Sequence, residues 1–68
     1  MINNDKELET TLERVRRFEQ QVARLRNSEL TSENYKMSAG GFLAEIDRMN
    51  LEIRDYLWSH PGDSAAAA

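Results

Sequence analysis

The chain has 68 residues, and its nine basic and twelve acidic side chains give a net charge of −3. This length allows one small domain, and the acidic balance disfavours a dedicated nucleic-acid binder. The sequence contains no cysteine, which excludes disulfides, iron–sulfur clusters and thiolate zinc sites. It holds one histidine and no glycine-rich phosphate loop. We therefore expect no enzyme, no catalytic residues, no metal, no cofactor and no small-molecule substrate.

The start of the chain lacks the basic and apolar stretches of a secretory signal. No apolar run approaches the roughly 20 residues that cross a bilayer. These features predict a cytoplasmic protein that has no membrane partner.

The first helical pattern begins after Asn4, which has the spacing of a capping box with Glu7. Apolar residues then recur every three or four positions, as one helical face requires. They are Leu8, Leu12, Val15, Phe18, Val22 and Leu25. The pattern predicts a helix from about residue 5 to about 28, followed by a turn at about 29–31.

The second pattern alternates steps of four and three over three heptads. Its members are Tyr35, Ala39, Phe42, Ile46, Met49, Ile53 and Tyr56, and Leu43 and Leu57 widen the same face. Thr31 or Ser32 can cap the start, and Pro61 disfavours helical angles at His60. We predict a helix over about 32–58, with flexible termini at 1–4 and 60–68.

Gly40 and Gly41 allow two interpretations of this second pattern. Either a loop ends there and the helix begins at Phe42, or the helix runs through both glycines. If the turn centres between Leu30 and Thr31, the residue numbers of antiparallel partners sum to about 61. Val15 then faces Ile46, and the match continues before the glycines, which favours the continuous helix. The sequence predicts an all-α fold, an antiparallel two-helix hairpin over 5–59 whose core is the two apolar sets above.

A second set of apolar residues lies opposite that core face. Met37, Ala44, Leu51 and Trp58 are spaced by seven, and Gly40 and Gly41 lie beside them. Scattered surface apolar residues are normal, but a hairpin needs only one apolar face per helix. We interpret these six residues as a candidate protein interface. They favour a non-enzymatic interaction or oligomerisation module, a homo-oligomer and above all a dimer, forming a four-helix bundle.

Three further patterns have simpler explanations. The row Arg14, Arg17 and Arg24 could contact phosphates, but acidic neighbours favour a solvated helix flank. His60 has no second histidine beside it, which disfavours a metal site. Glu9 with Glu13, or Glu45 with Glu52, could form a catalytic pair, yet two helices rarely make a pocket.

The segment Glu33 to Lys36, continuing through Ala39 to Met49 and Glu52 to Leu57, resembles a helical hairpin of some bacterial antitoxin-type proteins. In that family the hairpin precedes a helix-turn-helix domain, whose DNA-binding residues have no counterpart in these 68 positions. The resemblance implies an alternative function, a small antitoxin-like regulator. Such a regulator would dock on a specific protein partner through the outer face of the second helix.

Overall fold

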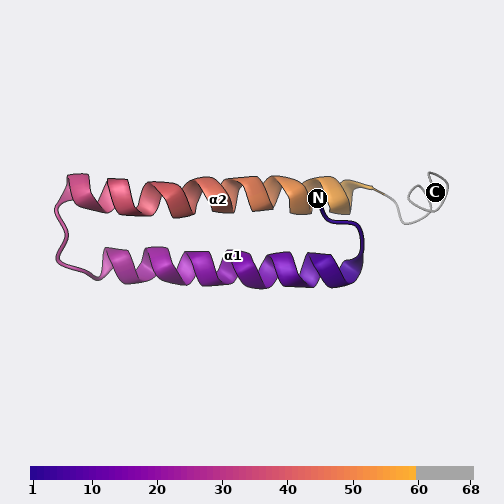
Figure 1. The fold of residues 1–68 in the computed structure, drawn as a ribbon, viewed down its shortest axis with the longest axis horizontal. Coiled ribbons are helices and arrows are strands. Elements are labelled where there is room, and N and C mark those ends of the chain that lie inside the picture. The colour runs from indigo at the N-terminus through magenta and orange to yellow at the C-terminus, as the bar shows by residue number, and fades with distance from the viewer. Residues whose placement is uncertain (60–68) are drawn as a thin grey trace.

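The computed structural model describes residues 1–59, which form two antiparallel helices joined by a turn (Figure 1). Helix α1 is Asp5–Arg26 and helix α2 is Ser32–Trp58. The predicted all-α hairpin is confirmed. Neither helix is long and apolar enough to cross a membrane. The expectations for His60 and for the tail at 60–68 lie outside the described residues.

Side chains that cap the backbone fix where each helix begins. The Asn4 side chain accepts a hydrogen bond of 2.8 Å from the Glu7 N–H. The Glu7 carboxylate accepts one of 2.8 Å from the N–H of Asn3, where a standard capping box would use the cap residue itself. The Thr31 hydroxyl accepts from the Asn34 N–H at 3.1 Å and begins α2. Both caps satisfy amides that have no partner within their helix.

The turn between the helices begins earlier than expected. Helix α1 ends at Arg26, so the connection covers 27–31 in place of the predicted 29–31. The Asn27 N–H donates to the carbonyls of Ala23 and Arg24 at 3.2 Å, and the Ser28 hydroxyl donates to the Arg24 carbonyl at 2.9 Å. These bonds occupy the last carbonyls of the helix and allow the chain to leave it.

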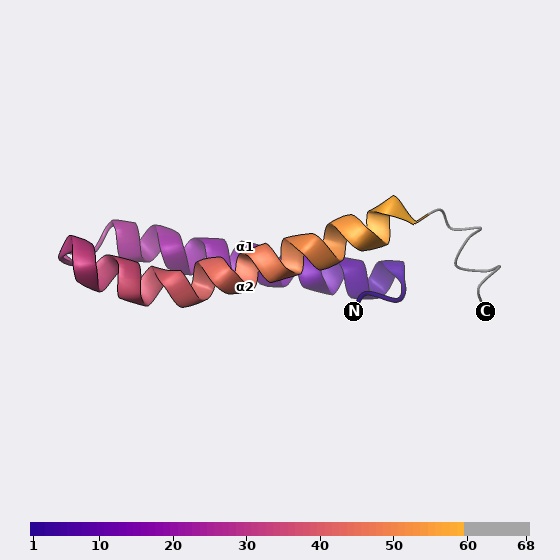
Figure 2. The same ribbon diagram turned by 90° about the horizontal axis from the view of Figure 1, so that it is seen from above.

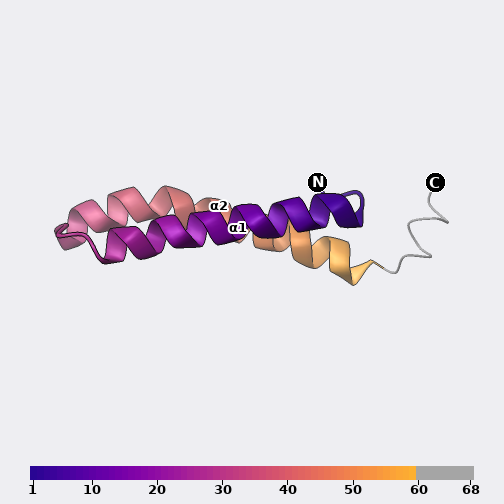
Figure 3. The same cartoon turned by 90° about the horizontal axis from the view of Figure 1, so that it is seen from below.

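Helix α2 runs without interruption through Gly40 and Gly41. The prediction of a continuous helix is confirmed, and the alternative of a loop before Phe42 is wrong. Seen from above and from below, α1 and α2 lie alongside each other and cross obliquely (Figures 2 and 3). Contacts between the two helices therefore extend on both sides of the glycines.

The core is a single seam between the helices. Val15 on α1 and Ile46, Met49 and Ile53 on α2 are buried, and Ile2 joins them. The residues packed against this cluster are Leu8, Phe18, Val22 and Tyr56. The rings of Phe18 and Phe42 meet edge to face at 5.5 Å, in agreement with the predicted register, which places Phe18 opposite Phe42 or Leu43. Ala39 is buried, while Leu25, Tyr35 and Phe42 are half-buried.

Leu12 corrects the predicted core, because 41% of its surface is exposed. At about 100° per residue, Leu12 lies about 40° to one side of Leu8, whereas Val15 and Thr11 lie to the other side. Leu12 is therefore at the edge of the apolar face of α1. Thr11 is nearer the seam and is half-buried.

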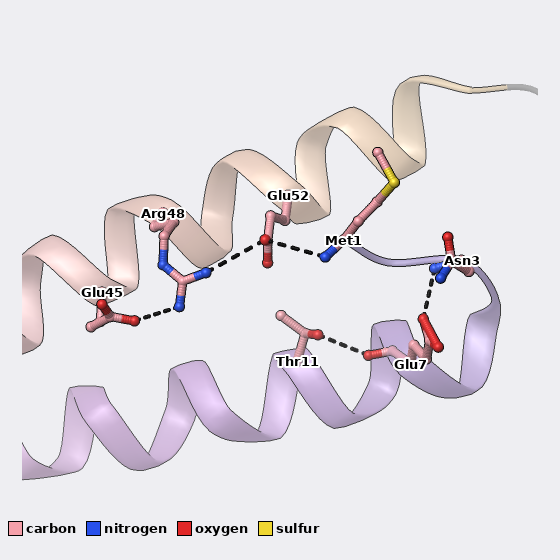
Figure 4. A network of polar contacts seen from close by, with 7 residues as sticks. All are labelled: Met1, Asn3, Glu7, Thr11, Glu45, Arg48 and Glu52. Atoms are coloured by element: carbon pink, nitrogen blue, oxygen red, sulfur yellow. Dashed lines mark hydrogen bonds and ion pairs between the residues drawn. The ribbon is translucent and has the colours of Figure 1, made fainter.

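The segment 1–4 corrects the expected flexible terminus. It folds back so that Ile2 is buried against the seam, with 8% of its surface exposed. The Met1 amine lies 3.5 Å from the Glu52 carboxylate, which also lies 3.5 Å from the Arg48 guanidinium (Figure 4). Apolar burial together with these charged contacts holds the segment over one edge of the seam.

The two helices are also joined at the open end of the hairpin. The Tyr56 hydroxyl donates a hydrogen bond to the Asp5 carboxylate. This bond raises the pKa of Tyr56 above its usual range, because the carboxylate favours the protonated phenol; partial desolvation acts in the same direction.

Truncating the centre of the seam tests the predicted register. We expect Ile46→Ala to lower the free energy of unfolding by about 2–4 kcal/mol, because it removes buried methyl groups and leaves a cavity. Leu12→Ala is the matched control and should cost about 1 kcal/mol or less, because Leu12 is already half in water. Urea denaturation followed by circular dichroism measures both. Equal losses for the two variants would contradict the described seam.

The Tyr56–Asp5 bond predicts a loss of stability in alkali. A group whose pKa is raised by folding contributes stability below its unfolded pKa, here about 10, and loses that contribution as pH rises through the folded pKa. In Tyr35→Phe, Tyr56 is the remaining tyrosine, and its phenolate absorbance should titrate above pH 10. Adding Asp5→Asn should return the pH midpoint of this titration toward 10. An unchanged midpoint would show that Asp5 is not the cause.

Candidate interaction surface

The six residues of the candidate interface, which we call the outer face, lie on the side of α2 turned away from α1. They are Met37, Gly40, Gly41, Ala44, Leu51 and Trp58, and all six are exposed. The exposed fractions of the large side chains are 75% for Met37, 58% for Leu51 and 86% for Trp58. The outer face thus combines large apolar side chains in water with a patch of small residues.

The spacing of the sequence explains why these residues share a face. A step of seven returns to nearly the same angle on a helix, so Met37, Ala44, Leu51 and Trp58 form one line, which we call the outer stripe. Ile46 and Ile53 lie about two residues from Ala44 and Leu51, which rotates them about 160–200° away. The outer stripe therefore points away from the seam, and the hairpin itself cannot bury it.

Gly40 and Gly41 have no role within the hairpin. A Cβ atom built on either residue meets nothing within 4 Å, and neither residue has a positive φ. Glycine within a helix costs about 1 kcal/mol relative to alanine because its backbone loses more freedom. The two residues together thus destabilise α2 by about 2 kcal/mol, and no close contact within residues 1–59 offsets this cost.

Charged residues border the outer stripe on both sides. Three and four positions after each stripe residue, the side chains lie about 50° to either side of the line. Asp47 and Arg54 are on one flank, with Arg48 and Asp55 on the other. Arg48 pairs with Glu45 and Glu52 of its own helix (Figure 4), and the hydrogen bond with Glu45 raises its pKa. Within residues 1–59, Asp47, Arg54 and Asp55 make no ion pair.

Leu43 and Leu57 were expected to widen the seam, but they are 45% and 63% exposed. Leu43 lies about 90° from the centre of the apolar face, and Leu57 stands almost level with the first residue of α1. With Leu12 they add apolar surface at the edge of the seam. Leu43 directly follows Phe42 and Leu57 directly follows Tyr56, so each is rotated by about 100° from a member of the core pattern. The spacing in the sequence therefore indicates a position beside the seam.

The other sequence features do not form a reactive site in residues 1–59. No cluster of three or more metal-ligating side chains occurs there. An open hollow of about 590 Å³ lies beside residues 1–3, and Glu52, Asp55 and Tyr56 contribute to its lining. Arg17, from the arginine row on α1, pairs with Glu13 at 3.9 Å.

Comparisons of the chain with protein-family models, with curated proteins and with solved structures found no match.

Replacing the glycines tests whether they cost the hairpin stability. We expect Gly40→Ala and Gly41→Ala each to raise the free energy of unfolding by about 0.5–1 kcal/mol, because both Cβ positions are open. The measurement is urea denaturation at low protein concentration, where the single hairpin unfolds. Asn50→Ala on the same helix is a control for helix propensity. A loss of stability in the glycine variants would mean that another part of the chain occupies that space.

Proposed function

We propose that this chain is a non-enzymatic protein–protein interaction module that self-associates, as a dimer, through the outer face of α2. The observation that supports the proposal is the exposure of Met37, Leu51 and Trp58 in one line on the helix side opposite the seam. Exposed apolar residues scattered singly need no explanation, but several large apolar side chains exposed in one line are typical of an interaction surface.

The energetics of a small hairpin favour association. The seam buries few side chains, and short chains bury a small fraction of their surface on folding. Burying Leu51 and Trp58 between two chains would remove about 300 Å² of apolar surface per chain, or several kcal/mol at about 25 cal/mol per Å². This gain competes with the loss of translational and rotational freedom on binding. We therefore expect a dimer whose population depends on concentration.

The position of the outer face changes the expected shape of the dimer. A compact four-helix bundle would need contacts at an edge of the seam, near Leu12 and Leu43. The outer face lies opposite α1, so contact there brings two α2 helices together in the middle and leaves the two α1 helices outside. The proposal is thus a row of four helices in place of the four-helix bundle.

Adding charge to the outer face tests self-association. We expect the double variant Leu51→Glu, Trp58→Glu to be a monomer, because burying four carboxylates at the contact is costly. The wild type should sediment as a dimer, and its melting temperature should rise with concentration. The melting temperature of the double variant should not depend on concentration. Analytical ultracentrifugation and thermal melts over a dilution series measure these differences.

The double variant Gln20→Glu, Gln21→Glu is a charge-matched control, because both residues are exposed on α1. It adds the same two negative charges and should leave the dimer intact. A wild type that is monomeric at tens of micromolar would contradict self-association. It would favour the alternative, docking of the outer face on a different protein in the manner of an antitoxin-like regulator.

A further inference from the structure

The two flanks of the outer stripe carry matched residues at three of four levels of the helix. The flanking residues come as consecutive pairs, one member on each flank. From the first turn to the last, the pairs are Glu33 with Asn34, Gly40 with Gly41, Asp47 with Arg48, and Arg54 with Asp55. Two of the four pairs thus join opposite charges, one joins two glycines, and one joins an acid with an amide.

We propose that two copies of this chain pair with their α2 helices parallel and in register, along the outer stripe. This inference rests on the proposed self-association and specifies how the two copies are arranged. In a parallel pair related by a two-fold axis along the helices, one flank of a copy meets the other flank of its partner at the same level. Asp47 then lies beside Arg48 of the second copy, and Arg54 lies beside Asp55 of the second copy. The symmetry repeats both contacts, which gives four ion pairs.

The same arrangement accounts for the glycines. Gly40 lies opposite Gly41 of the second copy, and Ala44 meets Ala44. These small residues let the two backbones approach closely over one turn of the helix. The space around the glycines is empty in the single chain, so it is free to receive a second backbone. Met37, Leu51 and Trp58 each meet their own copy and become buried.

Antiparallel pairings that keep the outer stripe in contact are less favourable. In them, each flank meets the same flank of the partner. A two-fold axis between Asp47 and Arg48 brings Asp47 to Asp47 and Arg48 to Arg48, which is repulsive. An axis at Ala44 places Asp47 and Arg48 opposite glycines. Neither arrangement pairs Asp47 or Arg48, although the axis at Ala44 brings Glu33 opposite Arg54 of the second copy.

An antiparallel axis at Leu51 does pair the charges, with Asp47 beside Arg54 of the second copy. It overlaps only residues 44–58, about 22 Å of helix, and leaves Met37 and both glycines uncovered. The parallel pairing uses the full α2, about 40 Å. Exposed ion pairs contribute little, so the length of apolar contact decides between the two. The parallel pairing has the ion pairs and the longer contact.

Engineered disulfides distinguish these arrangements, because the chain contains no cysteine. In the parallel pairing, Ala44→Cys and Leu51→Cys should each form a disulfide-linked dimer with its own copy, since both positions face themselves. Gln20→Cys, on the exposed side of α1, is the control and should not cross-link under the same mild oxidation. Non-reducing electrophoresis measures the linked fraction. Cross-linking of only one of the two stripe variants would overturn the parallel pairing.

A charge exchange provides a second test that does not depend on cysteine. Arg54→Asp places like charges at two contacts and should weaken the dimer roughly three- to tenfold. The exchange Arg54→Asp, Asp55→Arg keeps the composition and restores opposite charges in a parallel pair. It should return the dissociation constant to within about twofold of the wild type. In the antiparallel pairing at Leu51, the exchange would instead create four repulsive contacts.

Sedimentation of the wild type, compared with the charge variants, distinguishes a failure of self-association from a failure of the parallel register. A monomer at all concentrations would contradict self-association itself. A dimer in which the charge exchange weakens binding further than Arg54→Asp alone would leave self-association standing and overturn the parallel register.

Discussion

Two helices packed side by side share one seam, and this constraint determines the rest of the structure. Each helix has one neighbour, so each can bury one face within the chain. The buried side chains of α2 are Ala39, Ile46, Met49 and Ile53, all on the face toward α1. Any apolar residue elsewhere on α2 stays in water unless another molecule covers it. The exposure of Leu51 and Trp58 is thus a geometric consequence of where Ile46 and Ile53 lie.

Periodicity made most of the fold predictable from the sequence. The alternating steps of three and four in α2 fixed its apolar face, and matching that face to α1 indicated that the helix continues through Gly40 and Gly41. The contact between Phe18 and Phe42 follows from the same register. Periodicity does not predict the exposure of Leu12, because a residue at the edge of a helical face is near the pattern and still half exposed.

Periodicity does not predict the burial of Ile2, for a different reason. It stands alone in a polar segment, and one apolar residue has no period. Its burial depends on the way the chain turns back at Asn3 and Asn4, which only the folded structure reveals. The candidate interface was predictable from the sequence only in part. Spacing predicted which side of α2 is free, but the arrangement of a second molecule depends on the surfaces of two chains, through their charges and symmetry.

The hairpin has a closed end, where the turn joins α1 to α2, and an open end, where the first residues of the chain and the end of α2 lie (Figure 1). Contacts near the turn link residues close in sequence, so they form early and at low entropic cost as the hairpin closes. Contacts at the open end link residues about 50 positions apart, as Asp5 and Tyr56 do. Three separate contacts occur there: this hydrogen bond, the burial of Ile2, and the Met1 amine beside Glu52. These contacts thus lie at the end of the hairpin where closing the chain costs the most conformational entropy. They oppose separation of the two helices from their free ends.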